Sequence, residues 1–545
     1  MKKMVLVCLW AAIVSLCAGE PVLRVGFITD THIGETAESC AHVRKAFEVF
    51  RAQKADLIVH LGDIANLHYP SGYRHYRNIF NEVFAGCRPE QIFVYAGHDA
   101  IGFKDVDEAY RIVEKEIGAT NSIYAKRVLK GYPFLAFRQS ADPAKYEAEI
   151  SVAEKEFPGK PIFVLNHEPP VNTTYHSITW GSRKLRPVLE KHPRVVQFTG
   201  HAHSSVRDER NIWQGKFTSI SAGCLQRWAG TLVGTAPGGK DSDGMLLMEV
   251  YPDKLVIRRF EYTTGKEYRP DKRWIVPLPF DEKTAPYAPS RRYAETPAPE
   301  FAPGTVLKYH WENGLAVSYP EASDGVAEYR IDIEKTGSDG KWITFARYDQ
   351  FSGFYLKKPP EAWTVVLNPG YFTPGNKYRV SVYPMSYWHK CGKPLTAEFT
   401  APEQPAPKKV LEFKDPMKEL SFVAGRSRKP APVKNGFYQL RNVEAGNLIL
   451  PDDFWDGEFK KARYRLIVDF YADQTPDMPW VMLVLDPKTN TRMTSRICTV
   501  PGNEGLRRYV VEFNKYLKDM HCEIQLRGGG PGLVRFEKVR LERIR

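Results

Sequence analysis

The sequence predicts a layered α/β domain followed by two C-terminal all-β sandwich domains. Three observations lead to this fold class. The chain has 545 residues, too many for one hydrophobic core at ~150 residues per domain. Apolar strand-like runs alternate with helical stretches up to about residue 279, whereas short alternating strands separated by Gly, Pro and Asp fill the rest. Two Pro-rich segments, 280–303 and 401–409, separate these regions.

The composition is that of an ordinary globular protein and excludes the disordered and fibrous classes. Hydrophobic residues make up 43% of the chain and charged residues 26%. The net charge is +13, but Lys and Arg are interspersed with Asp and Glu, so no basic block stands out. This surplus indicates mild attraction to anionic partners such as phosphate. The sequence contains no nucleic-acid-binding motif.

The N-terminus has the pattern of a secretory signal peptide. The chain begins with MKK, a positive n-region, and Met4–Leu16 is an apolar stretch too short to span a bilayer. Cleavage after Gly19 would make residues 1–19 the signal peptide and predicts a secreted or periplasmic protein. The alternative is a lipoprotein anchored at Cys17, which is less favoured because a Leu precedes it where a small residue is wanted. No later apolar run is long enough for a transmembrane segment.

The first domain, residues 20–290, is predicted to contain five buried strands, a long helix and a closing hairpin. The apolar runs that predict the strands are 23–29, 56–61, 91–96, 161–166 and 195–199. Residues 41–53 have helical periodicity, and the runs 244–250 and 254–262 predict the hairpin. This alternation is typical of α/β layering.

Residues 304–400 are predicted to form a small β-sandwich. Their alternating runs, separated by turn residues, are 326–333, 363–367 and 378–382. The stretch FTPGNKYRVSVYP resembles the fibronectin type III pattern, with Tyr378 at the position of its tyrosine corner.

Residues 410–545 are predicted to form a second β-sandwich without a long helix. Their short strands resemble a jelly-roll domain of the carbohydrate-binding kind. Trp455, Tyr471 and Trp480 would form a platform on which a sugar ring stacks. The alternative is that these aromatic side chains belong to the sandwich core, as such residues more often do.

Polar motifs follow all five predicted strands of the first domain. In chain order they are Asp30-Thr31-His32, Gly62-Asp63, Gly97-His98-Asp99, Asn166-His167-Glu168 and Gly200-His201-Ala202-His203. Because strand carboxyl ends meet at one edge of an open α/β sheet, these motifs should face one pocket. Carboxylate and imidazole together suit Mn²⁺, Fe or Zn²⁺. Two such ions ~3.5–4 Å apart clamp a phosphoryl group and generate hydroxide, so the pattern predicts a two-metal site for a phosphate ester.

The five motifs in this order resemble the calcineurin-like metallophosphoesterase superfamily, over about residues 22–279. The resemblance implies a metal-dependent phosphoric ester hydrolase. The metal ligands that it implies are Asp30, His32 and His203 for the first ion, His167 and His201 for the second, and Asp63 as the bridge. It also implies that His98 binds the substrate or protonates its leaving group.

One position departs from the family pattern. The family has Asn directly before the His of the third motif, where this chain has Gly97, which supplies no side chain. In an ungapped alignment the second metal loses a ligand and binds more weakly, or uses water or Asn66 instead. With a one-residue deletion, His98 itself is the ligand. Both alignments stay open on the sequence alone.

Four further residues, Asn66, His176, Trp180 and Arg207, are candidates for substrate contact. His176 and Trp180 follow the fourth motif and could line the substrate pocket. Arg207 follows the fifth motif and could meet a phosphate, although a solvated surface position is the simpler interpretation.

Two classes of function fit the sequence. The first is a secreted phosphoesterase, with a phosphodiester slightly favoured over a phosphomonoester because monoesters need more positive charge around their free oxygens. The second is a catalytically weak or inactive surface protein with a degraded metal site, whose β-domains bind a polysaccharide or surface glycan. Metal content and turnover of a chromogenic ester distinguish the two.

Overall fold

The computed structural model describes most of the chain. The residues outside the description are 1–18, 35–36, 67–69, 119–123, 140, 226–229, 232–233, 236–243, 357, 425–428, 441–445, 450–461, 474–479, 487–490, 499–505, 515–522, 528–531 and 545. Residues 1–18 of the expected signal peptide, which include Cys17, therefore lie outside the described residues. Within the described ranges, no helix is long and apolar enough to cross a membrane.

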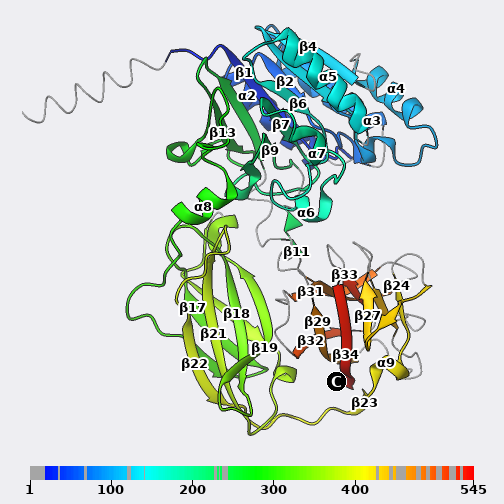
Figure 1. The fold of residues 1–545 in the computed structure, drawn as a ribbon, viewed down its shortest axis with the longest axis vertical. Coiled ribbons are helices and arrows are strands. Elements are labelled where there is room, and N and C mark those ends of the chain that lie inside the picture. Colours follow the sequence, from blue (N-terminus) through cyan, green and yellow to red (C-terminus); the bar gives the residue numbers. More distant parts are fainter. Residues whose placement is uncertain are drawn as a thin grey trace, which may run out of the picture. The chain divides into compact units, whose positions relative to one another are not determined.

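The chain divides into two compact units. The first consists of Met1–Gly230 and Gly238–Glu295, and the second of Thr231–Pro237 and Thr296–Arg545. The first unit is α/β and the second is built from β-sheets (Figure 1). The predicted fold class is thereby confirmed.

Two sheets form the centre of the first unit. The strands of one sheet, in the order β14-β13-β12-β1-β2-β3 with β15 beside β13, are β1 (Leu23–Ile28), β2 (Leu57–His60), β3 (Glu90–Phe93), β12 (Gly244–Val250), β13 (Lys254–Glu261), β14 (Glu267–Tyr268) and β15 (Trp274–Pro277). The strands of the other, in the order β4-β5-β6-β7-β9-β8, are β4 (Tyr124–Leu129), β5 (Tyr132–Phe137), β6 (Ile162–Leu165), β7 (Val195–Thr199), β8 (Ile212–Gln214) and β9 (Thr218–Ser221). The two sheets share one core, in which Phe27 stacks on Phe198 with ring centroids 3.9 Å apart.

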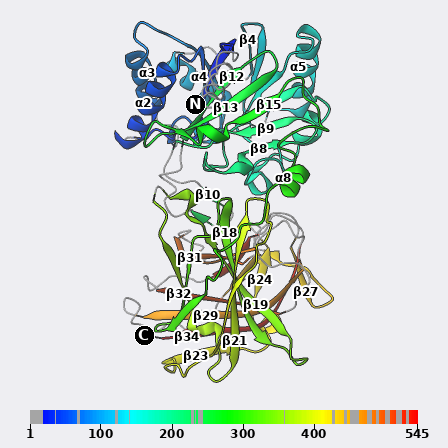
Figure 2. The ribbon, with the colours of Figure 1, turned by 90° about the vertical axis from the view of Figure 1, so that its left-hand side faces the viewer.

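Helices cover the outer faces of both sheets, so the unit has four layers. The helices of the first sheet are α2 (Ala37–Ala52), α3 (Pro70–Val83) and α4 (Val106–Ile117), and those of the second are α5 (Pro143–Glu156) and α7 (Arg186–Leu189). Figure 2 shows α2 and α3 on one side of the strands and α5 on the other. The sequence predicts all five motifs on one open sheet. This prediction is wrong, because β1, β2 and β3 belong to one sheet and β6 and β7 to the other.

The two sheets nevertheless bring their motifs to a common edge. Strands β1, β2 and β3 are parallel to one another, and so are β6 and β7. The end of β7 lies directly against the end of β1, because Asp30 Oδ2 accepts a hydrogen bond from the His201 backbone N–H at 2.9 Å. Only glycine fits at position 200, where a Cβ atom would overlap the side chain of Thr29.

The second unit begins with a two-sheet β-sandwich. Its sheets, in the orders β16-β17-β20 and β19-β18-β21-β22, consist of β16 (Lys308–Trp311), β17 (Leu315–Pro320), β18 (Val326–Thr336), β19 (Trp342–Phe351), β20 (Ala362–Leu367), β21 (Lys377–Ser386) and β22 (Leu395–Thr400). The Tyr378 hydroxyl accepts a hydrogen bond from the Thr373 backbone N–H at 2.8 Å. This contact resembles a tyrosine corner, and the likeness to fibronectin type III stays a prediction.

The rest of the second unit forms two six-stranded sheets. The first contains β23 (Lys409–Phe413), β26 (Val433–Lys434), β27 (Phe437–Leu440), β29 (Arg463–Asp473), β32 (Arg507–Asn514) and β34 (Gly532–Arg543), and the second contains β24 (Phe422–Ala424), β25 (Lys429–Pro430), β28 (Gly446–Ile449), β30 (Trp480–Asp486), β31 (Thr491–Cys498) and β33 (Glu523–Arg527). Of the proposed sugar platform, Trp455 and the Trp480 side chain lie outside the described residues. Tyr471 is half-buried beneath Arg535, whose guanidinium lies 4.6 Å from the ring centroid.

The two β-sandwiches pack against each other within the second unit. Ile467 and Val510, from the second sandwich, belong to the hydrophobic core of the first. The Val510 backbone N–H donates a hydrogen bond to the Tyr371 hydroxyl at 3.1 Å, and Arg507 donates to the Thr344 carbonyl oxygen. The Pro-rich segment 401–409 therefore joins two sandwiches that share apolar packing.

Candidate metal centre

The five motifs meet in one cluster of carboxylates and imidazoles. Its ligand atoms form three overlapping groups, within each of which they all lie within 4.8 Å of one another. The groups are Asp30, His32 and His203; His32, Asp63 and His98; and Asp63, His167 and His201. The structure thus brings together all seven residues that the sequence predicts as metal ligands or as the acid.

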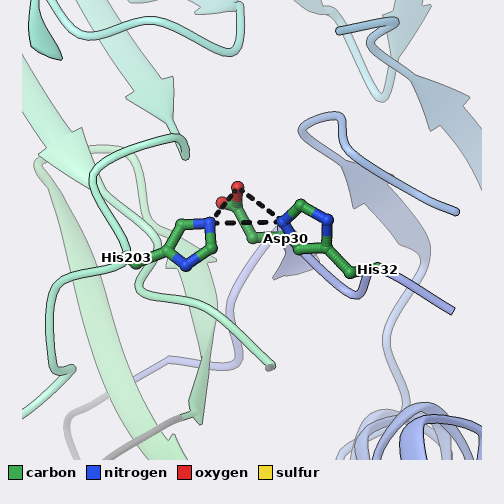
Figure 3. A group of neighbouring side chains, drawn as sticks. All are labelled: Asp30, His32 and His203. Atoms are coloured by element: carbon green, nitrogen blue, oxygen red, sulfur yellow. Dashed lines mark hydrogen bonds and ion pairs between the residues drawn. The ribbon is translucent and has the colours of Figure 1, made fainter. Parts of the chain in front are cut away.

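The first group gathers two imidazoles around one carboxylate (Figure 3). Asp30 is completely buried, and its Oδ2 accepts hydrogen bonds from the Thr29 hydroxyl at 2.7 Å and the His201 N–H at 2.9 Å. Its Oδ1 accepts no well-aligned hydrogen bond from the described residues, although His203 Nε2 lies 3.0 Å away. His32 Nε2 lies 3.8 Å from the same oxygen and 3.3 Å from His203 Nε2. One oxygen and two ring nitrogens therefore face a common point, as ligands around a cation do.

The second group is oriented by a backbone carbonyl. His167 Nδ1 lies 2.8 Å from the Leu61 carbonyl oxygen, so Nδ1 carries the proton and donates it there. This leaves Nε2 directed at Asp63 Oδ2, 3.2 Å away, and at His201 Nδ1, also 3.2 Å away. A carbonyl that fixes the tautomer of an imidazole is the usual outer support of a metal-binding histidine.

Asp63 lies between the two groups. Its Oδ2 is 3.2 Å from His167 Nε2 and 3.8 Å from His32 Nε2, so one carboxylate oxygen faces an imidazole of each group. Its Oδ1 accepts a hydrogen bond from the His98 N–H at 3.0 Å. This is the position that a bridging carboxylate needs.

Five of the cluster residues have left-handed backbone conformations. Their φ angles are 49° for Asp30, 39° for His32, 53° for Asp63, 67° for His201 and 45° for His203. Such a conformation costs a non-Gly residue about 1–3 kcal/mol, and residues of this kind concentrate at functional sites. These backbone conformations reduce the stability of the fold, but they turn the five side chains toward one another.

The electrostatics set the protonation states that metal ligands require. Burial alone would raise the pKa values of Asp30 and Asp63, but the neighbouring imidazoles outweigh it, chiefly His203 for Asp30 and His167 for Asp63, and lower both. Burial lowers the pKa of His32 and that of His201 to about 4. Both carboxylates are therefore ionised and both imidazoles neutral near pH 7, as metal binding demands.

His203 and His167 behave differently when the cluster holds no cation. Burial acts to lower the pKa of His203, but the Asp30 carboxylate raises it, and His167 shows the same effect. Burial acts to lower its pKa, but the carboxylates of Asp63 and Asp30 raise it to about 10. Its proton thus stands in for positive charge between two buried carboxylates. A bound cation would take over that charge and displace the proton.

Asp99 is a positioning residue to which the sequence analysis assigned no role. Its buried carboxylate accepts hydrogen bonds from the backbone N–H groups of Asp63 at 3.1 Å and Ile64 at 3.0 Å, and from that of Ala96 at 3.2 Å. It thereby ties the second motif to the third. Burial and the charge of Asp63 raise its pKa to about 7. Its place next to His98 was the only signal of this role in the sequence.

At the departure from the family pattern, a glutamine occupies the neighbouring space. The Gly97 N–H donates a hydrogen bond to Gln139 Oε1 at 2.5 Å, and a Cβ atom at Gly97 would lie 3.3 Å from that oxygen. Gln139 Nε2 in turn donates to Glu168 Oε1 at 2.8 Å. Gly97 does not have a positive φ, so its backbone admits a side chain. His98 lies edge-on to His32, with ring centroids 4.6 Å apart.

The remaining candidates lie outside the three groups. Asn66 donates its backbone N–H to the Ile33 carbonyl oxygen at 3.1 Å. His176 Nδ1 lies 3.2 Å from the Ala202 carbonyl oxygen, between two cluster histidines, so this side chain supports the loop of the fifth motif. Arg207 is buried and forms an ion pair with Glu261 at 2.6 Å, which occupies its guanidinium.

The donor set fits two divalent metal ions. Each of the two outer groups offers one carboxylate and two imidazoles, which is a combination that Mn²⁺, Fe and Zn²⁺ accept. Asp30 Oδ1 is the ligand atom that a cation would satisfy most directly, because it is buried, accepts no well-aligned hydrogen bond and has His203 Nε2 3.0 Å away.

Residues 23–205 match the family model of calcineurin-like phosphoesterases. The N-terminal part of the chain is therefore a calcineurin-like metallophosphoesterase domain. No curated protein matches the chain significantly.

Several solved structures are similar at low identity. A dimetal phosphatase from Danio rerio is 11% identical over 48% of this chain and 100% of its own, with a TM-score of 0.35. A purple acid phosphatase from yellow lupin (Lupinus luteus) seeds is 13% identical over 45% of this chain and 52% of its own, with a TM-score of 0.33. A carbohydrate-binding module of family 4 is 12% identical over 25% of this chain and 88% of its own, with a TM-score of 0.16. Similarity at this level carries no information on substrate.

Proposed function

We propose that the first unit hydrolyses a phosphate ester with a hydroxide that two divalent metal ions activate. The observation that carries the proposal is the position of Asp63, whose Oδ2 faces His167 at 3.2 Å and His32 at 3.8 Å. A single carboxylate between two sets of ligands is what a two-metal centre requires.

The roles follow from the three groups. Asp30, His32 and His203 would hold the first ion, His167 and His201 would hold the second, and Asp63 would bind both. Two bound divalent ions polarise the phosphoryl oxygens and supply hydroxide at neutral pH. The protein's own part is to orient the substrate beside His98, which lies at the cluster but is only half-buried. We assign His98 to the leaving oxygen, to which it donates a proton.

A phosphodiester is the favoured substrate. A monoester carries one more negative charge on its free oxygens, and a site for it needs cationic side chains around them. Arg207, the cation that the sequence offers for contact with a phosphate, forms an ion pair with Glu261 instead. We further propose that the protein is exported, on the strength of the signal-like pattern in residues 1–19.

The test measures metal and turnover on the same sample. Purified protein is stripped with a chelator and reloaded separately with Mn²⁺, Fe²⁺ or Zn²⁺, its metal content is determined by mass spectrometry, and hydrolysis of bis(p-nitrophenyl) phosphate and p-nitrophenyl phosphate is followed. The proposal expects two equivalents of metal and faster hydrolysis of the diester. Faster hydrolysis of the monoester would overturn the diester assignment. Absence of metal and of turnover would instead favour the alternative, a glycan-binding protein with a vestigial metal site.

A further inference from the structure

A cavity of about 450 Å³ lies in the first unit. Ligand sites for small molecules have volumes of this order. Its lining comes from three segments: the connection from β5 to α5 and the start of that helix, the fourth motif, and residues 182–185, which follow α6 (Ser177–Trp180).

The cavity borders the metal centre. Glu168, in its lining, directly follows His167. Gln139, also in its lining, accepts the hydrogen bond from Gly97, the neighbour of His98. Each lining residue named here is thus tied to a different ligand motif.

The last residue of α6 and the segment after it connect the metal centre to the cavity. Trp180 lies edge-on to His201, with ring centroids 5.7 Å apart, and Ser182 lines the cavity two residues later. Pro170 and Ser182 pair as an isolated β-bridge, which fixes this segment to the fourth motif. The cavity therefore lies on the side of the cluster formed by His167 and His201.

The lining combines polar groups with apolar surface, which suits an organic group that carries hydroxyls. Gln139 and Glu168 form a hydrogen-bonded pair at 2.8 Å. Asn166 donates to the Glu168 carbonyl oxygen. The Tyr146 ring stacks on Phe137 with centroids 3.8 Å apart, which holds this lining residue in place.

Two cations in the lining have no carboxylate partner. Arg183 and Lys184 are exposed, and neither side chain forms a hydrogen bond or an ion pair with any residue that the structure describes. Cations that follow within a few residues are paired: Arg186 with Glu190 at 2.8 Å, and Lys191 with Glu147 at 2.7 Å. Two carboxylates also line the cavity, but Asp142 accepts a hydrogen bond from the Ala144 N–H at 3.0 Å and Glu168 accepts one from Gln139 at 2.8 Å. The charges of Arg183 and Lys184 are not paired with either carboxylate and are complementary to an anion.

We propose that this cavity binds the organic group of the ester, and that Arg183 and Lys184 select esters whose organic group carries a second anionic group, a carboxylate or a further phosphate. This inference rests on the proposed phosphoesterase function, because the metal centre is taken to hold the ester's own phosphate.

The experiment uses two non-hydrolysable probes that differ by one carboxylate, phenylphosphonate and 4-carboxyphenylphosphonate. Their dissociation constants are measured by calorimetry on the metal-loaded full chain, for the wild type and for the double variant Arg183→Gln/Lys184→Gln. The matched control is Lys54→Gln, since Lys54 is also exposed but precedes β2 and thus lies at the opposite end of the strands from the motifs. Exposed ion pairs contribute up to about fivefold each, so the wild type should bind the carboxylated probe about tenfold more tightly.

The expected result is that the double variant reduces this preference to about twofold or less, whereas the control retains it. Equal binding of both probes by the wild type, or an unchanged preference in the double variant, would overturn the inference. Metal content and bis(p-nitrophenyl) phosphate turnover of the same wild-type sample distinguish failure of the anion selection from failure of the phosphoesterase function. Turnover without a preference refutes only the anion selection, and a preference that depends on Arg183 and Lys184 without turnover refutes only the phosphoesterase.

Discussion

The His98 backbone N–H donates a hydrogen bond to Asp63 Oδ1 at 3.0 Å, while Asp63 Oδ2 faces imidazoles of both outer ligand groups. One carboxylate therefore holds the third motif with one oxygen and joins the two halves of the cluster with the other. Asp30 has a related position, because its Oδ1 lies 3.0 Å from His203 Nε2 and 3.8 Å from His167 Nε2, but Asp63 Oδ2 lies closer to His167.

Replacement of Asp63 by Asn should abolish metal binding and activity while the domain stays folded. The amide keeps the size of the side chain and can still accept from His98, but it removes the negative charge that both ions share. Metal content and bis(p-nitrophenyl) phosphate turnover measure the loss, and circular dichroism checks the fold. Full metal stoichiometry in this variant would show that Asp63 is not the bridge.

Replacement of Gly97 by Asn should tighten the second metal and raise activity at low metal concentration. The backbone at Gly97 does not require glycine, and the new Cβ needs Gln139 Oε1 to move by only a few tenths of an ångström from 3.3 Å. The comparison is with Gly97→Ala, which makes the same steric demand without offering an amide oxygen. A titration of activity against metal concentration distinguishes the two variants. Lower activity in Gly97→Asn but not in Gly97→Ala would indicate that His98 is already the ligand.

Replacement of Asp99 by Ala should weaken both the domain and its metal centre. The change leaves the buried N–H groups of Asp63, Ile64 and Ala96 without their acceptor, at about 1–3 kcal/mol for each unsatisfied group. We expect a clear fall in the unfolding temperature and a lower metal affinity, measured by thermal unfolding and metal titration. Asp99→Asn retains one acceptor oxygen and should lie between the wild type and Asp99→Ala. Unchanged metal affinity in Asp99→Ala would show that Asp99 does not position the metal ligands.

Stability of the first unit in acid should depend on Glu209. Its carboxylate pairs with Arg259 at 2.8 Å and Arg292 at 2.9 Å and accepts from Trp274 Nε1 at 3.0 Å. Burial acts to raise its pKa, but the two guanidinium groups outweigh it and hold the pKa below the usual value. A depressed carboxylate pKa contributes stability that is complete above the unfolded-state pKa of about 4.3 and disappears as the pH falls through the folded-state value.

Glu209→Gln should therefore cost about 3 kcal/mol of unfolding free energy at pH 7, because it leaves two guanidinium groups without their counter-charge. Denaturant unfolding at pH 7 and pH 3 measures the difference between variant and wild type. It should shrink as the pH falls, because the wild-type carboxylate loses its charge, and with it the ion pairs, as the pH falls through its lowered pKa. A difference that stays constant between the two pH values would mean that packing, not charge, causes the loss.

A chain that ends after Glu295 should retain metal and hydrolyse a small ester. The first unit extends to that residue, and the last helix, α8 (Pro289–Glu295), supplies Arg292 to Glu209. A chain that ends at residue 290 loses this arginine and should be less stable. Metal content and turnover of bis(p-nitrophenyl) phosphate are the measurements. A folded, metal-loaded but inactive truncated chain would mean that the second unit contributes to the active site.

The strand-end motifs were predictable because each follows a run of apolar residues, and such a run predicts a buried strand directly from the sequence. The strand predicted over 195–199 coincides with β7, and that over 161–166 differs from β6 by one residue at each end. The division of these strands between two sheets was not predictable. Both faces of every such strand are buried, against helices on one side and the other sheet on the other, so the residue pattern is the same in either arrangement.

The supporting contacts of the site were also beyond the sequence. Asp99 bonds to backbone N–H groups, which every residue type except proline offers, so its partners leave no mark in the residue pattern. Arg207 meets Glu261, 54 positions later, only because β13 folds back beside the fifth motif. Neither pairing has a local spacing by which it could be recognised.

The apolar packing between the two β-sandwiches bears on how such chains can be cut and recombined. Separation at 401–409 would expose Ile467 and Val510, which the core of the first sandwich covers, and would break the hydrogen bond between Val510 and Tyr371. Each separated sandwich would then have an exposed apolar face. The two sandwiches should therefore be moved to another protein together, and a graft that separates them at 401–409 should aggregate.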